Sequence, residues 1–203
     1  LEGHGMICWA DTSEECEALS LELIARAERF LADHEVDGAF GAVRDEYVAL
    51  PDDERSLRAA ALAAAVRGVA ASERWMVGAF SDAPVVLDFL SREAAPRLAA
   101  LGTSCPDHFL RTKIRPLVLD FDPAKPDVDA LLAGLDQALQ AYRADYTAYY
   151  ERCKRANSPA IRDANPVIYL IPGVGMLSFA KDKATARIAG EFYINAINVM
   201  RGA

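Results

Sequence analysis

Residues 166–200 read PVIYLIPGVGMLSFAKDKATARIAGEFYINAINVM and hold two apolar runs, a glycine turn and a helical pattern in succession. The runs at 166–171 and 176–180 predict two buried strands, because both are short, apolar and bounded by turn residues. Gly173 and Gly175 between them favour a tight β-turn. The residues from 182 to 200 predict a closing helix. A strand hairpin followed by a helix indicates a layered α/β protein.

Similar patterns recur upstream, so strands and helices alternate along the chain. We predict further strands at residues 4–10, 75–80 and 116–121, a loop at 102–107, and helices at 14–34, 51–71, 83–100 and 129–156. Tyr142, Tyr146, Tyr149 and Tyr150 share one face of the last of these helices, and we interpret that face as core packing.

The composition is that of a globular protein and excludes several function classes. The 203 residues include 52% hydrophobic residues and carry 22 Lys and Arg against 30 Asp and Glu, a net charge of −8. The acidic balance argues against a nucleic-acid partner, and no apolar run is long enough to cross a membrane. The sequence has no signal peptide, and we interpret its four cysteines as reduced thiols, so we expect a cytoplasmic protein. We also expect the protein to form a homo-oligomer.

An internal repeat suggests how the chain is divided. Residues 3–10 (GHGMICWA) align with residues 173–180 (GVGMLSFA), and a long helical pattern follows each copy. Since residue 1 is Leu and the first copy begins at once, we expect the chain to be a piece of a longer protein. We predict that residues 1–50 are the C-terminal part of a first repeat and that residues 51–203 are a second, degenerate repeat.

His4 is the candidate metal ligand. It lies between two glycines in the first copy, where Val174 stands in the second copy. Neutral imidazole is a common zinc ligand, and flanking glycines allow the backbone to approach a metal closely. A catalytic zinc site needs further donors, however, and no His-x-His motif is present. A purely structural histidine therefore remains the alternative at this position.

A second candidate site lies in residues 105–116 (CPDHFLRTKIRP), directly before a predicted strand. In an extended chain Arg111, Lys113 and Arg115 share one face, where they could bind a phosphate or carboxylate. Asp107 and His108 could form an acid–base pair. The candidate substrate-binding residues are thus Asp107, His108, Arg111 and Lys113, and the alternative is a solvated, self-neutralising edge.

Residues 1–16 (LEGHGMICWADTSEEC) resemble the N-H-G-x-x-x-x-G-x-T-x-x-E-A signature of class II aldolases of the fuculose-phosphate aldolase/adducin type. Together with residues 106–113, 171–176 and 201–203, the chain resembles the bifunctional rhamnulose-1-phosphate aldolase/short-chain dehydrogenase proteins. It departs from the signature at Glu2 and Ala10 and, in the second copy, at Val174.

The resemblance implies a three-layer α/β/α fold with a mixed, mostly antiparallel sheet, here incomplete. It also implies zinc-dependent cleavage of rhamnulose 1-phosphate, a small phosphorylated sugar, to dihydroxyacetone phosphate and lactaldehyde. His4 matches the third zinc ligand, while the other ligands and the acid/base glutamate lie upstream of this chain.

NAD would enter only through a dehydrogenase domain outside the chain. In agreement, Gly173-x-Gly175 lacks the third glycine of the dinucleotide fingerprint, because Ser178 replaces it. We therefore expect these 203 residues alone to be inactive and to bind zinc weakly or not at all. Two alternatives remain: a non-catalytic scaffold, or an independent enzyme that uses the 105–116 segment.

Overall fold

The computed structural model describes residues 5–34, 40–45, 47–71, 75–103 and 105–202. The described residues form seven helices and four strands, which follow one another in the order α1 (Ser13–Asp33), α2 (Asp52–Ala70), β1 (Val77–Ser81), α3 (Pro84–Leu90), α4 (Ala95–Ala100), α5 (Pro106–Thr112), β2 (Leu117–Val118), α6 (Val128–Cys153), β3 (Ile168–Ile171), β4 (Gly175–Ala180) and α7 (Lys183–Gly202). The predicted α/β class is confirmed.

The four strands form one mixed sheet in the order β1-β4-β3-β2. β4 pairs antiparallel with both β1 and β3, and β2 pairs parallel with β3. The sheet is therefore mostly antiparallel, as predicted. Every residue of β3 and β4 is buried, which explains why their sequences are continuous apolar runs rather than alternating patterns.

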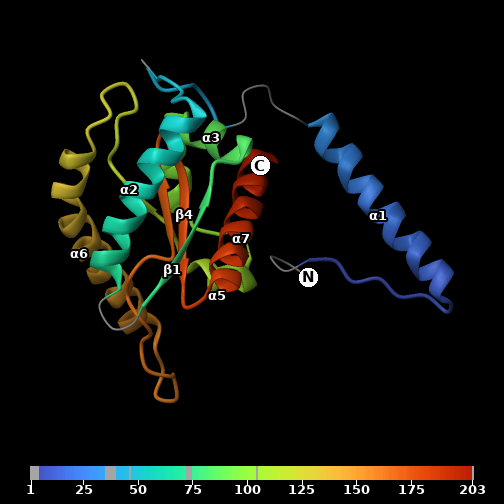
Figure 1. Cartoon of the computed structure of the whole chain (residues 1–203). Coiled ribbons are helices and arrows are strands. Elements are labelled where there is room, and N and C mark those ends of the chain that lie inside the picture. Colours follow the sequence, from blue (N-terminus) through green and yellow to red (C-terminus); the bar gives the residue numbers. More distant parts are fainter. Residues whose placement is uncertain (1–4, 35–39, 46, 72–74, 104, 203) are drawn as a thin grey trace.

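Helices cover both faces of the sheet (Figure 1). Tyr169 and Ile171 of β3 pack into one core with α2 and α6, whereas Ile168 and Leu170 pack into a second core with α3, α4 and α7. Successive strand side chains point to opposite faces, so one buried strand serves both cores. The predicted three-layer α/β/α arrangement is thereby confirmed.

The N-terminal part of the chain is organised differently. Figure 1 shows α1 apart from the α/β body, with the residues before it leading to the end of α1 that is farther from that body, and α1 buries none of its residues. The predicted strand at 4–10 is wrong over the described residues Gly5–Ala10, which are irregular. A strand is stable only beside a hydrogen-bonded neighbour, and no described strand pairs with this segment.

No helix in the described part of the chain is long and apolar enough to cross a membrane.

Candidate functional site

The hairpin between β3 and β4 shows why the second copy of the repeat needs both of its glycines. Gly173 has φ +73°, and a Cβ there would lie 2.4 Å from Cβ of Pro123. Gly175 has φ +138°, and a Cβ there would lie 2.6 Å from the carbonyl oxygen of Ser81. Only glycine combines this backbone conformation with so close an approach. The predicted tight turn is confirmed.

Residues 5–33 repeat the local geometry of β4 and α7 at equivalent positions. Gly5 has φ +147°, close to the +138° of Gly175. Thr12 caps α1 by accepting a hydrogen bond of 3.2 Å from the backbone N–H of Glu15. Asp182 caps α7 in the same way, accepting a bond of 2.7 Å from Thr185.

A third match joins each extended segment to its helix. In the second copy Ser178 Oγ donates to the carbonyl of Ala186 at 2.8 Å. In the first copy the equivalent pair is also in contact, because Cys16 Sγ donates to the carbonyl of Cys8 at 3.7 Å. The aligned residues therefore share a glycine of positive φ, a helix cap and a contact between equivalent residues, although the donor belongs to the helix in the first copy and to the strand in the second.

The residue at the candidate metal-ligand position differs between the two copies, His4 in the first and Val174 in the second. His4 lies outside the described residues. Its counterpart Val174 is fully buried in the core that includes Ile171 and Leu177. Among the residues that the structure describes, no three His, Cys, Asp or Glu side chains gather closely enough to hold a metal ion. The described residues therefore do not supply a complete zinc site by themselves.

The 105–116 segment does not form the extended chain predicted for it. Pro106–Thr112 is the helix α5, so the expected alternation of Arg111, Lys113 and Arg115 on one face is wrong. The predicted loop at 102–107 ends two residues early for the same reason, because α5 begins at Pro106. Asp107 and His108 are consecutive on this helix, where neighbouring side chains diverge instead of facing each other.

The basic residues of this segment are held by different partners. Lys113 has φ +62°, its Nζ donates to the carbonyls of Asp163 and Asn165, and it lies 4.4 Å from the centre of the Tyr146 ring. Arg115 instead forms an ion pair with Asp145 at 2.5 Å. The structure therefore separates these two cations and does not bring them together as one anion-binding face.

The remaining candidates in this segment also diverge. Asp107 and Arg111 are exposed, whereas Nδ1 of His108 is buried without a hydrogen-bond partner and the His108 ring packs edge-on against Phe192 of α7. A hollow of about 430 Å³ lies beside Arg58 and Pro126, and another of about 340 Å³ lies beside Pro96 and Tyr142. Neither is lined by Asp107, His108, Arg111 or Lys113.

Only one member of the tyrosine stripe is a core residue. Tyr142 is buried and donates to the carbonyl of Arg115 at 2.8 Å, and burial raises its pKa. Tyr146, Tyr149 and Tyr150 are half-buried, so the interpretation of the whole stripe as core packing is wrong for these three. Tyr146 instead packs against Nζ of Lys113, and the hydroxyl of Tyr150 donates to the carbonyl of Pro159 at 2.6 Å.

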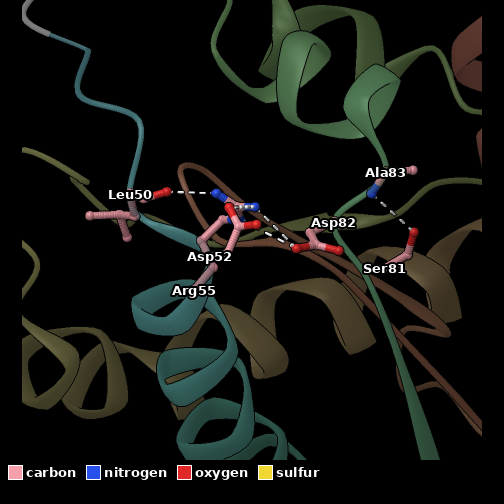
Figure 2. A network of polar contacts seen from close by, with 6 residues as sticks. All are labelled: Leu50, Asp52, Arg55, Ser81, Asp82 and Ala83. Atoms are coloured by element: carbon pink, nitrogen blue, oxygen red, sulfur yellow. Dashed lines mark hydrogen bonds and ion pairs between the residues drawn. The ribbon is translucent and has the colours of Figure 1, made fainter.

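Figure 2 shows a polar network at the sheet edge next to the hairpin turn, which the sequence did not reveal. Arg55, at the start of α2, donates to the carbonyl of Leu50 at 2.6 Å, to Asp52 at 2.7 Å and to Asp82 at 3.2 Å. Asp82 directly follows β1. The guanidinium therefore clamps the start of α2 to the end of β1.

Replacing Arg55 with lysine should lower the free energy of unfolding by about 1–2 kcal/mol, because an ammonium cannot reproduce the fork of three hydrogen bonds. Urea unfolding of both proteins measures the difference. Arg187→Lys is the matched control, since the pair of Arg187 with Glu191 is exposed and should contribute under about 0.5 kcal/mol. Equal effects of the two substitutions would exclude the clamp.

Comparisons with known proteins agree with this architecture. A family model described as aldolase class II, second domain, matches residues 57–203. The whole chain is also 34% identical over 207 residues to a protein of Bacillus subtilis (strain 168) named uncharacterized oxidoreductase YuxG. The chain covers 29% of that relative, so it spans less than a third of the relative's length. No solved structure matches the chain significantly.

Proposed function

Because the chain belongs to the class II aldolase family, we propose that it is part of a zinc-dependent aldolase that cleaves rhamnulose 1-phosphate to dihydroxyacetone phosphate and lactaldehyde. In this proposal the whole protein also carries a short-chain dehydrogenase domain, which would use NAD to oxidise the aldehyde. The greater length of the Bacillus relative and its description as an oxidoreductase support a second activity in the same polypeptide.

The observation that carries the proposal is the difference between the two copies of the repeat. Residues 5–33 share with β4 and α7 a glycine of positive φ and a capped helix. The residue before Gly175, however, is Val174, which is fully buried in the core. We infer a division of roles in which residues 1–50 complete a metal-binding unit through His4. Residues 51–203 then act as a non-catalytic scaffold of the same fold.

His4 would contribute a single imidazole, so the proposal requires donors from a part of the protein outside residues 1–203. The expected substrate is a small phosphorylated sugar. Asp107, His108, Arg111 and Lys113 stay as candidate contacts for its phosphate only if another part of the protein approaches α5, because α5 alone does not bring them together.

The test is His4→Ala in the full-length protein, with metal content and cleavage of rhamnulose 1-phosphate as the two measurements. We expect the variant to lose its zinc and to lose more than about 100-fold in turnover, since even the loss of a residue that only supports a ligand costs about 10–100-fold. His34→Ala is the control, because His34 is exposed at the end of α1 and its Nδ1 lies 2.7 Å from the carbonyl of Phe30.

A variant that retains both zinc and turnover would contradict the assignment of His4. If the wild-type full-length protein holds no zinc and cleaves no sugar phosphate, the scaffold role alone remains.

A further inference from the structure

The helices of the two copies differ sharply in burial. In α7 the face turned to the sheet is fully buried, and its members are Ala186, Ala189, Tyr193, Ala196 and Ile197, all at 0–1% exposure. In α1 no residue is buried, although the aligned positions hold mostly small or apolar side chains: Cys16, Leu19, Leu23, Arg26 and Ala27. The same helical face is therefore fully buried in one copy and at most half-buried in the other.

The polar side of each helix also matches. Glu17 and Glu28 of α1 align with Arg187 and Asn198 of α7, and all four are exposed. Leu21 aligns with the exposed Glu191. The alignment thus distinguishes a face of α1 whose counterpart in α7 is buried from a face whose counterpart in α7 is exposed to solvent. A helix with such an apolar stripe gains most of its stability by packing that stripe on another element.

We propose that the docking face of α1, defined as Cys16, Leu19, Ser20, Leu23 and Ala27, packs on a β-sheet formed by a preceding segment of the same polypeptide, as α7 packs on β4 and β1. Residues 6–10, which hold the exposed Met6, Ile7 and Trp9, would join the edge of that sheet as its last strand. No described strand pairs with these residues, so their backbone can supply the donors and acceptors that such a strand needs.

Three observations favour this occupant over a second copy of the chain. The segment from Gly5 to α1 has the positive glycine φ, the helix cap and a contact between residues 8 and 16, as the equivalent positions of β4 and α7 have in a unit that packs on its own sheet. The matching family model is that of a second domain and begins at residue 57, after α1. The Bacillus relative is also more than three times the length of the matched region, which leaves room for a preceding sheet.

The inference shares with the proposed function only the premise that residues 1–50 belong to a first unit. It makes no use of the metal, and its test measures neither zinc nor turnover. A failed aldolase assay and a failed docking experiment are therefore distinguishable results.

Thiol labelling of the native full-length protein tests the docking face directly. Cys16 lies on that face, whereas Cys153 is exposed at the end of α6 and serves as the internal control. We expect maleimide to modify Cys16 at least about tenfold more slowly than Cys153, a protection equivalent to about 1.4 kcal/mol of local opening free energy. Peptide mass spectrometry reads the two sites separately, and urea-unfolded protein gives the unprotected rates.

Dilution separates the two possible occupants. Protection by a sheet of the same polypeptide is independent of protein concentration, whereas protection by a second copy disappears on dilution. Protection that holds from micromolar to nanomolar protein supports the proposal. Labelling of Cys16 as fast as Cys153, or protection lost on dilution, overturns it.

Two leucines on opposite sides of α1 give a matched pair of variants. Leu23→Asp places a carboxylate on the docking face, at the position aligned with the buried Tyr193, and should expose Cys16 to labelling. Leu21→Asp places the same group at the position aligned with the exposed Glu191 and should leave Cys16 protected. Equal effects of the two substitutions would overturn the assignment of the face, and the wild-type labelling decides the proposal even if Leu23→Asp does not fold.

Discussion

Replacing Gly102 with alanine should lower the free energy of unfolding by about 2–5 kcal/mol, one of the two largest single-residue effects that we expect. Gly102 follows α4 with φ +86°, and its N–H donates to the carbonyl of Ala99 at 3.1 Å. A Cβ there would lie 2.1 Å from the carbonyl oxygen of Ile114. An alanine at position 102 would therefore be strained by the positive φ and would also clash with the carbonyl oxygen of Ile114. Ile114 lies on the segment that leads into β2, so its backbone cannot easily move away.

The measurement is the urea unfolding curve, supported by a fall in melting temperature on the order of 10 °C. Gly134→Ala is the control, because Gly134 lies in the middle of α6 with no atom within 4 Å of the added Cβ. That substitution should stabilise the protein by about 0.5–1 kcal/mol through helix propensity. If Gly102→Ala unfolds at the same urea concentration as the wild-type protein, the close approach to Ile114 is not real.

Replacing Asn165 with alanine should lower the free energy of unfolding by about 3 kcal/mol, because the change leaves two buried groups without partners. Asn165 is 5% exposed. Its amide nitrogen donates to the carbonyl of Ala70 at 2.8 Å, and its amide oxygen accepts from Nε of Arg143 at 2.7 Å. Arg143 also donates to the carbonyl of Val69 at 3.0 Å.

These contacts satisfy carbonyls at the end of α2, where a helix has no partners of its own. Asn165 and Arg143 therefore hold the end of α2 against α6 and the start of β3. A double-mutant cycle with Arg143→Met should give a coupling energy of about 0.5–3 kcal/mol. Asn157→Ala, at an exposed position after α6, is the control and should change stability by less than about 0.5 kcal/mol. Additive effects of the Asn165 and Arg143 substitutions would contradict a shared network.

The long helices and the hairpin were predictable because each carries several agreeing local signals. The helix at Ser13–Asp33 has a Thr12 cap with Glu15 three residues later, and both hydrogen bonds of the capping box are present. The strands at 168–171 and 175–180 are apolar throughout and are separated by a proline and glycines. Local chemistry and tertiary packing agree in these segments, so the sequence pattern is enough.

The candidate sites were harder to predict because they depend on contacts between distant residues. Pro106 is a good first residue of a helix, yet the alternating cations after it favoured an extended chain. Packing of α5 on α7 decides between the two conformations, and the local sequence does not contain that information. Asn165 gave no signal either, because a single polar residue does not reveal partners that lie some 95 residues earlier in the chain.

The order of the strands also constrains how the polypeptide folds during synthesis. Of the four described strands β4 is the last to be synthesised, yet it lies between β1 and β3, and Val77 is paired with Ala180. Until residues 175–180 emerge, β1 has no neighbouring strand with which to form its hydrogen bonds. Such pairing between residues far apart in the sequence slows folding, so the incompletely folded chain has more time to aggregate. A nascent chain stalled before residue 175 would therefore be a natural target for chaperones.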